Sequence, residues 1–131
     1  MHLNHVVVNA GCNALDKGFH TMYSQLKDTL NTIKTNDNES DINALLEFID
    51  NQNICTNLML VVSELGEAVE HLRAGRFANS ETWKETFEEE IADAIIRLGD
   101  LCFHLGIDIK PIIEKKMKYN TERPIKHGKK F

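Results

Sequence analysis

Residues 58–75 read LMLVVSELGEAVEHLRAG, and this stretch decides the fold class. Its apolar residues recur at intervals of three and four, and on a helical wheel they fall within one arc of about 120°. They are Leu58, Val61, Val62, Leu65, Ala68, Val69 and Leu72. The spacing predicts a long amphipathic helix over about 54–74, which stops at Gly75 because glycine favours the end of a helix.

A second stretch of the same kind follows along the chain. Residues 81–105 carry an apolar arc of their own, made of Phe87, Ile91, Ala94, Ile95, Leu98, Leu101, Cys102 and Leu105. Asn79 and Ser80 are favoured N-cap residues, and Gly106 is a favoured stop. We therefore expect two core helices, about 54–74 and 81–105, whose apolar arcs pack on one another.

The segment before these helices also has helical spacing. Residues 4–34 carry apolar residues at helical intervals, with a break near Gly18. Residues 35–41 are polar and rich in turn formers, which indicates a loop. A short helix is expected over 42–49, and it is expected to end before the polar run that begins at Asn51.

The C-terminal part favours one last helix. It is expected over about 108–120, with Pro111 tolerated in its first turn. Because strand patterns are almost absent, the sequence predicts an all-α antiparallel helical bundle. We expect a single domain over 1–131, in which residues 28–53 are a loop plus short helix and residues 115–131 are a basic C-terminal segment.

Composition excludes several classes of protein. The 131 residues are 42% apolar and 27% charged, which is ordinary for a soluble globular domain. Cys12, Cys55 and Cys102 are too widely spaced for a zinc knuckle or a disulfide framework, which favours the reducing cytoplasm. The N-terminus lacks the pattern of a secretory signal, and no apolar run is long enough to span a bilayer, so we expect no membrane partner.

The net charge of −5 is unevenly distributed. Residues 110–131 carry eight Lys and Arg against two Asp and Glu, whereas residues 1–109 carry seven against 18. An acidic body with a basic end is expected for a metal site beside a phosphate site, or for a solvated tail. A nucleic-acid partner is disfavoured because the protein is acidic and its basic segment lacks interleaved aromatic residues.

Two pairs of carboxylates flank the apolar arcs. Glu64 and Glu67 are three residues apart on the first core helix, and Glu90 and Asp93 are three apart on the second. If the arcs pack together, the four carboxylates converge, and such a cluster is costly unless a cation neutralises it. Oxygen ligands favour Mg²⁺ or Mn²⁺, which commonly serve phosphate-bearing substrates. The alternative is that these are solvated surface residues.

Other residues that often carry chemistry give weaker signals. The chain has no Glu-x-x-His motif, which argues against a di-iron carboxylate bundle. We expect no chemical role for His2, His5 and His20, and we expect His71 to be a surface residue. Trp83 is expected to pack against protein rather than to contact a ligand.

Several motifs together resemble those of the MazG-like all-α nucleoside triphosphate pyrophosphohydrolases. They are Glu64-Leu-Gly-Glu67, Glu89-Glu90-Ile-Ala-Asp93 and Lys116-Met-x-Tyr119-Asn120-x-x-Arg123-Pro124-x-Lys126-His127-Gly128-Lys129. The segment Asn13-Ala-Leu-Asp-Lys17-Gly18-Phe19 is similar to a motif near the start of many members. Ser63 departs from the family's pattern, because it stands in place of the first of two consecutive glutamates.

The resemblance implies a Mg²⁺-dependent enzyme, active also with Mn²⁺, that hydrolyses (deoxy)nucleoside triphosphates to monophosphate and pyrophosphate. It further implies a homo-oligomer, a dimer or a tetramer, that removes unwanted nucleotides from the cytoplasmic pool. The implied metal ligands and catalytic residues are Glu64, Glu67, Glu90 and Asp93. The implied substrate-binding residues are Asn13, Lys17, Phe19, Lys116, Tyr119, Asn120, Arg123 and Lys126.

Three alternatives remain at the level of sequence. A phosphoribosyl-ATP pyrophosphohydrolase or an all-α dUTPase would use a similar set of carboxylates, and a panel of substrates would separate them. A helical regulatory or interaction module without catalysis would instead bind Mg²⁺ and nucleotide without turnover. The four intact carboxylates argue against this last alternative.

Overall fold

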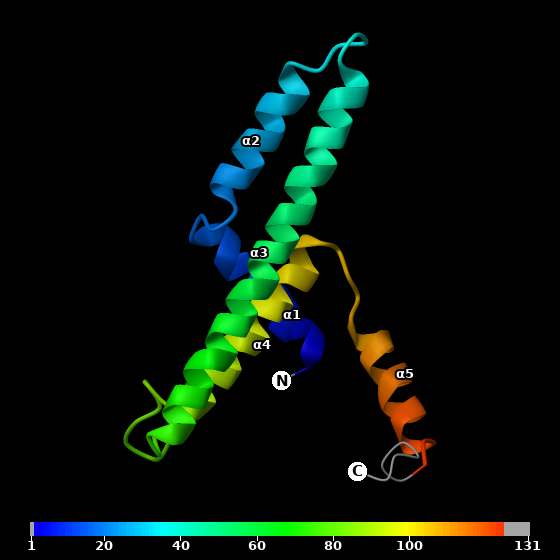
Figure 1. Cartoon of the computed structure of the whole chain (residues 1–131). Helices are drawn as coiled ribbons and strands as arrows, with labels where there is room; N and C mark the ends of the chain where they lie inside the picture. Colours follow the sequence, from blue (N-terminus) through cyan, green and yellow to red (C-terminus); the bar gives the residue numbers. More distant parts are fainter. Residues whose placement is uncertain (1, 125–131) are drawn as a thin grey trace.

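The computed structural model of the protein describes residues 2–124. Figure 1 shows that this part consists of helices joined by short connections and, over residues 74–86, by a longer loop. The helices are α1 Leu3–Asp16, α2 Thr21–Thr32, α3 Glu39–Arg73, α4 Phe87–His104 and α5 Lys110–Thr121. Within these described residues no strand occurs, so the predicted all-α class is confirmed.

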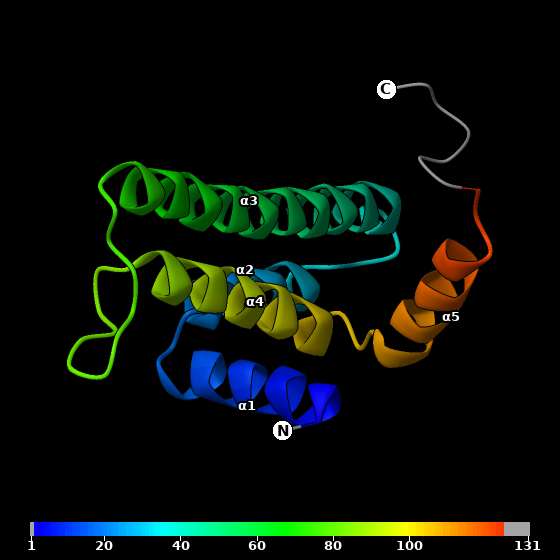
Figure 2. The ribbon, with the colours of Figure 1, turned by 90° about the horizontal axis from the view of Figure 1, so that it is seen from below.

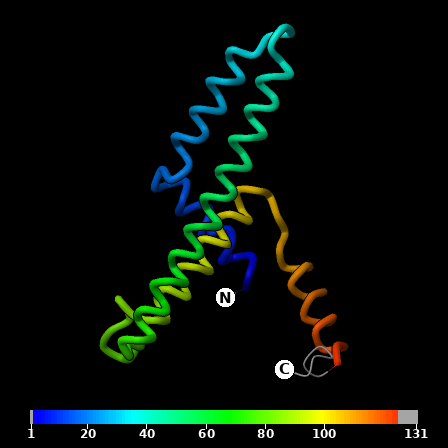
Figure 3. Tube along the Cα trace, in the orientation of Figure 1, coloured from blue at the N-terminus to red at the C-terminus, as the bar shows by residue number. Residues whose placement is uncertain are grey.

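The long helix α3 is the element on which the bundle is built. Its first half packs against α2, and its second half packs against α4 (Figure 1). Each of these neighbours runs antiparallel to α3, and α1 packs on the side of α4 that faces away from α3 (Figure 2). The Cα trace in Figure 3 shows α5 leaving this bundle rather than joining it.

The expected break near Asn51 is absent, because residues 39–73 form one continuous helix. Asparagine and glutamine weaken a helix by only a fraction of a kcal/mol each, and neighbouring helices compensate for that cost. Side chains on the next turn also bond back to the helix, since Thr56 Oγ1 donates to the Gln52 carbonyl and Asn57 Nδ2 donates to the Asn53 carbonyl. The predicted short helix and first core helix are therefore one element.

Helix α4 begins six residues later than predicted, at Phe87 rather than Glu81. Asn79 Oδ1 accepts the backbone N–H of Glu81 and of Thr82, so it closes a turn instead of capping a helix. The N-cap is Thr86, whose hydroxyl oxygen accepts the Glu89 N–H at 3.3 Å. Three glutamates in the first turn then stabilise the start of the helix, because their negative charges interact favourably with the positive end of the helix dipole.

The apolar arc of α3 does not form the interface with α4, contrary to the sequence prediction. Only Val61 and Ala68 of the arc are buried, whereas Val62 and Leu72 are 54% and 50% exposed. The buried ridge of this half of α3 consists of Val61, Glu64, Ala68 and His71. The helix is therefore rotated so that one edge of the arc faces α4 and the rest faces outward.

The contact between α1 and α4 depends on small residues. Ala10, Gly11 and Ala14 are the buried residues of α1, and a Cβ added to Gly11 would overlap the ring of Phe103 and stand 2.6 Å from the Phe103 Cβ. On the other helix, a Cβ at Gly99 would lie 3.4 Å from the Ala10 Cβ. Both glycines allow the two backbones to approach closely.

We predict that Gly11→Ala destabilises the protein. Alanine favours a helix over glycine by about 1 kcal/mol, but the clash with Phe103 costs about 1–3 kcal/mol, so the net effect is a loss of stability. Urea unfolding followed by circular dichroism measures this difference. The matched control is Gly66→Ala, because a Cβ at Gly66 meets nothing within 4 Å and the variant should gain stability. A Gly11→Ala protein as stable as the wild type would contradict the close packing.

The helix ends at Gly75 and Gly106 were predicted correctly. Both residues have a positive φ, 67° and 65°, a conformation that glycine adopts without strain. The last helix is also confirmed, although it begins at Lys110, two residues later than expected, with Ile109 as its N-cap. Across residues 2–124, none of the helices combines the length and apolar character needed to cross a membrane.

Candidate functional site

Two carboxylates are buried in the interface between α3 and α4. Glu64 and Glu90 are each only 7% exposed, and they lie beside the buried alanines Ala68 and Ala94 of the same two helices. Asp93, one turn after Glu90, is half-buried. Oxygen atoms from the three carboxylates all lie within 4.8 Å of one another. We refer to Glu64, Glu90 and Asp93 as the acidic cluster.

Two basic residues contact the acidic cluster. Arg97 Nε donates to Glu64 Oε1 at 2.6 Å, and His71 Nε2 donates to Glu90 Oε1 at 3.1 Å. His71 is buried, and among residues 2–124 its Nδ1 atom has no hydrogen-bond partner. The expectation that His71 is a surface residue was wrong, because the rotation of α3 turns this face toward α4. Its ring instead orients a carboxylate of the cluster.

The cluster is electrostatically strained. Burial raises the pKa of Glu90 above its usual range, and the neighbouring Glu64 and Glu67 raise it further, whereas the hydrogen bond from His71 opposes the shift. The pKa of Asp93 is also raised, first by burial and then by Glu64 and Glu89. These raised pKa values mean that ionisation of Glu90 and Asp93 destabilises the folded protein. A bound cation would remove this destabilisation.

Glu67 does not join the other three predicted ligands. It is exposed on α3, and its carboxylate lies outside the group of oxygens that approach within 4.8 Å. Its charge nevertheless raises the pKa values of Glu90 and Asp93, so it is near the cluster. The prediction of four converging carboxylates therefore holds for three of them, with Glu67 at the edge.

We predict that Mg²⁺ stabilises the folded protein, and more strongly near pH 7.5 than near pH 5.5. A carboxyl whose folded-state pKa is raised destabilises the fold above that pKa and ceases to do so as the pH falls through it. A cation removes the same penalty at neutral pH, whereas protons compete with it in acid. At ten times its dissociation constant a ligand adds about 1.4 kcal/mol of stability, which raises the melting temperature by several degrees.

Thermal melting with and without Mg²⁺, at constant ionic strength, measures this effect. Glu64→Gln should abolish the Mg²⁺-dependent shift. Glu70→Gln is the matched control, because Glu70 is exposed on the same helix and pairs with Arg73 rather than with the cluster. A shift of equal size in all three proteins, or at both pH values, would show that the ion does not bind at the cluster.

A cavity of about 330 Å³ adjoins the acidic cluster. Its walls come from α1, the turn between α1 and α2, α3 and α4. Asp93 and Arg97 lie on its wall, so the cluster and the cavity share residues. The remaining lining residues are Ala10, Asn13, Ala14, Phe19, His20, Asn53, Thr56, Asn57, Leu60, Ile96 and Asp100. This volume is at the lower end of the range for small-molecule sites.

One side of the cavity is formed by a buried histidine. His20 is 6% exposed, and its Nε2 lies 3.2 and 3.1 Å from the two carboxylate oxygens of Asp100. Its ring stacks on His104 with centroids 4.5 Å apart, and burial together with this neighbour lowers the pKa of His104. The sequence assigned His20 no chemical role, and in the structure His20 fastens the α1–α2 turn to α4 through Asp100.

Two amides of α3 face the same cavity. Asn53 and Asn57 are one turn apart, and Asn57 Nδ2 donates to the Asn53 backbone carbonyl at 2.8 Å. This bond leaves the Asn57 side-chain oxygen as an acceptor, while Asn53 offers both an acceptor and donors. Together with Asn13 they give the cavity polar groups that are able to bond the edge of a planar heterocycle.

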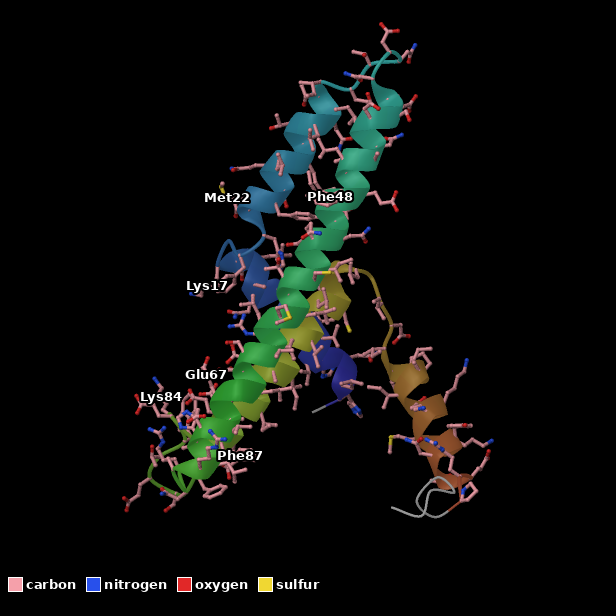
Figure 4. The ribbon with its side chains drawn as sticks, in the orientation of Figure 1. Lys17, Met22, Phe48, Glu67, Lys84 and Phe87 are labelled. Atoms are coloured by element: carbon pink, nitrogen blue, oxygen red, sulfur yellow. The ribbon has the colours of Figure 1, made fainter. Side chains whose placement is uncertain are left out.

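The predicted substrate-binding residues fall into two groups. Asn13 and Phe19 line the cavity, whereas Lys17 is exposed and does not. In Figure 4, Lys17 and Glu67 project to the same side of α3, and α5 lies on the other side. Lys116, Tyr119, Asn120 and Arg123 therefore stand apart from the acidic cluster of their own chain. Lys126 lies outside the described residues, and Trp83 is 62% exposed between α3 and α4.

Sequence reasoning gave no role in the site to Arg97, Asp100, Asn53 and Asn57, although Arg97 and Asp100 share the helix ridge of Glu90 and Asp93. A signal was present for two of them, because Arg97 and Asp100 follow Asp93 at helical intervals of four and three. No comparable signal marked the asparagines, since the predicted break placed Asn53 in a connection and Asn57 lay in the first turn of the predicted core helix without a partner motif. No family model, curated protein or solved structure matches this chain.

Proposed function

We propose that the protein is a Mg²⁺-dependent nucleoside triphosphate pyrophosphohydrolase of the MazG-like all-α type, which releases monophosphate and pyrophosphate. The observation that carries the proposal is the acidic cluster buried between α3 and α4 beside a cavity that Asp93 and Arg97 help to line. Burial raises the pKa values of Glu90 and Asp93 and destabilises the folded protein, and a purely structural interface gains nothing in return. Such burial is understandable where a cation is to be held.

The donor set fits magnesium. Glu64, Glu90 and Asp93 offer only oxygen atoms, which Mg²⁺ and Mn²⁺ prefer and which suit zinc poorly. When bound, the ion would polarise phosphoryl oxygens and activate a water molecule. His71 would keep the carboxylate of Glu90 oriented, as hydrogen-bonding partners of metal ligands commonly do. Glu67, at the edge of the cluster, would orient the attacking water.

Arg97 links the two halves of the proposed site. Its Nε is engaged by Glu64, while its side chain is 42% exposed and lines the cavity. A guanidinium has further N–H groups in a planar fork, and these match the oxygens of a phosphate. Arg97 would therefore neutralise charge on the triphosphate as it develops during hydrolysis. It also balances Glu64 in the absence of substrate.

The cavity would accept the nucleoside. Its polar groups come from Asn13, Asn53 and Asn57, and the aromatic ring of Phe19 offers a surface for stacking. The ion pair of His20 and Asp100 would fix the wall against which the base lies. A compact cavity favours a single nucleoside over the larger phosphoribosyl-ATP, so the general triphosphate activity ranks above that alternative. A dUTPase is a special case of the same reaction.

The decisive experiment is a panel of dNTPs, NTPs and modified triphosphates, incubated with purified protein with and without Mg²⁺. Products are identified by chromatography. We expect monophosphate and pyrophosphate only with Mg²⁺ or Mn²⁺, and we expect no turnover by Glu64→Gln. Orthophosphate instead of pyrophosphate would contradict the reaction type. Intact triphosphates throughout would contradict the function, and phosphoribosyl-ATP would be tested next.

The non-catalytic alternative makes a different prediction in the same samples. A regulatory module would bind Mg²⁺ and a nonhydrolysable triphosphate, which calorimetry detects, yet would release no product. Glu70→Gln again serves as the matched control, because it removes a carboxylate from α3 without touching the cluster. Equal loss of turnover in Glu70→Gln and Glu64→Gln would exclude a specific role for the cluster.

A further inference from the structure

One histidine attaches the turn between α1 and α2 to α4. His20 is the last residue before α2, and its Nε2 lies 3.2 and 3.1 Å from the two carboxylate oxygens of Asp100. The backbone of the turn bonds to its neighbouring helices instead, since the Phe19 N–H donates to the Ala14 carbonyl. Within residues 2–124, no other hydrogen bond joins residues 17–20 to α4. The position of the turn against α4 therefore depends on His20.

A second histidine lies against the ring of His20. The rings of His20 and His104 are stacked, with centroids 4.5 Å apart and planes at 9° to each other. The ring of Tyr23, in the first turn of α2, makes an edge contact with His104 at a centroid distance of 5.5 Å. Stacked imidazoles pack well while at least one is neutral, whereas two protonated rings at this distance repel each other. The stacked pair is therefore compatible with one proton and destabilised by two.

The surroundings of the stacked pair make the second proton costly. The charged or titratable residues around His104, or lining the cavity beside His20, are Tyr23 and Lys27 on α2, Asp50 on α3, and Asp93, Arg97 and Asp100 on α4. Burial lowers the pKa of His104 below its usual value, and the charges of His20 and Lys27 lower it further. The carboxylates of Asp100 and Asp50 oppose this change without reversing it.

Acid consequently weakens the contact between the turn and α4. A histidine whose pKa is lowered in the folded protein binds more protons when its ring is in water, so protonation favours the open state. The effect begins as the pH falls below the usual histidine pKa of 6.5. The raised pKa values of Glu90 and Asp93 act in the opposite sense, because acid stabilises the interface between α3 and α4. The destabilisation by acid is thus directed at the turn.

The turn forms part of the wall of the cavity. Phe19 and His20 line the cavity beside Asn13 and Ala14, which lie near the end of α1. If the turn moves away from α4, this wall opens. We propose that His20 and His104 form a pH-sensitive latch, which holds the turn against α4 near neutral pH and releases it when both rings are protonated. The latch controls access to the cavity and does not depend on which ligand the cavity binds.

Hydrogen exchange followed by mass spectrometry tests the latch without any assay of activity. Exchange is measured at pH 7.5 and pH 5.5, and each rate is divided by the intrinsic rate at that pH. Peptides over residues 17–24 report the turn, because the Ser24 N–H bonds the His20 carbonyl. Uptake of one proton on opening changes the opening equilibrium by at most about tenfold per pH unit. We expect their protection to fall by about tenfold in acid, while that of the second half of α3 does not fall.

Three variants assign the effect to the stacked pair. His104→Phe keeps an aromatic ring against His20 but removes the proton, so the protection of the turn should no longer depend on pH. Asp100→Asn keeps an acceptor for His20 and removes the opposing charge, so protection should be weaker at both pH values. His5→Phe is the matched control, because His5 is exposed on α1, and it should behave as the wild type. Circular dichroism verifies that each variant folds.

Nuclear magnetic resonance tests the wild type without any substitution. The ring signals of the stacked pair should show the second protonation in the same pH range in which the turn loses protection. A turn that stays protected after the second protonation would overturn the proposal, as would a pH dependence that persists in His104→Phe. Equal loss of protection in the turn and in α3 would show general unfolding in acid and would also exclude a latch.

Discussion

Replacing Asp93 with asparagine is expected to lower kcat/KM for the proposed triphosphate hydrolysis by about 10³-fold, because one of the three proposed metal ligands would be lost. The substitution keeps the size of the side chain and removes a negative charge from a cluster in which burial, Glu64 and Glu89 already raise the pKa of Asp93. The folded protein should therefore be at least as stable as the wild type without metal. Activity measured beside urea unfolding distinguishes this result from simple misfolding.

In the same assay, replacing Glu67 is expected to lower kcat/KM less than replacing Asp93 does. Glu67 is exposed and lies outside the group of close oxygens, so Glu67→Gln is expected to cost about tenfold, in the range of residues that assist metal ligands. Added Mg²⁺ should partly restore Asp93→Asn if its defect is weaker metal binding. An equal loss in both variants would show that the substrate-bound site gathers all four carboxylates. No loss in Asp93→Asn would remove the cluster from the chemistry.

Replacing Arg97 with alanine is expected to lower kcat/KM by about 10²–10³-fold. Two effects would contribute, because the proposed triphosphate substrate would lose a cation and Glu64 would lose the partner that donates to it at 2.6 Å. Arg97→Lys keeps the charge without the planar fork, so it should recover only part of the activity. A phosphate contact predicts a rise in KM together with a fall in kcat, which steady-state kinetics resolves.

The matched control for Arg97 is Arg73→Ala. Arg73 lies on α3 in an exposed pair with Glu70, and removing such a pair changes stability by less than about 1 kcal/mol. Its kinetics should equal those of the wild type. If Arg97→Ala alters the melting temperature but leaves both kinetic constants unchanged, Arg97 serves only to balance the charge of Glu64 within the interface.

The helical class could be predicted because the apolar periodicity is strong and because glycine marks the ends of α3 and α4. Gly75 and Gly106 are found where the pattern placed them, since few other residues adopt a positive φ at low cost. The start of α4 could not be predicted in the same way. Asn79 and Thr86 are both good caps, and only the tertiary structure determines which of them closes a turn and which begins the helix.

The arrangement of site residues within a single helix could be predicted from the sequence, but the arrangement between helices could not. Spacing of three residues relates Glu90 to Asp93 within α4, whereas the meeting of these residues with Glu64 depends on how α3 is rotated about its axis. A wide apolar arc leaves that rotation undetermined when part of it faces outward. For this reason His71 was misjudged as a surface residue and Arg97 was given no role. The hydrogen-bond partner of each lies on the other helix, Glu90 for His71 and Glu64 for Arg97.

The burial of Glu64 and Glu90 has a consequence for how this protein would evolve in the laboratory. Replacing buried charged residues with apolar residues of similar volume is often neutral or stabilising. A library selected only for thermal stability should therefore accumulate leucine or methionine at these two positions, and the survivors would be inert. Sequences from such a selection would record a trade-off between stability and activity, concentrated at one helix interface.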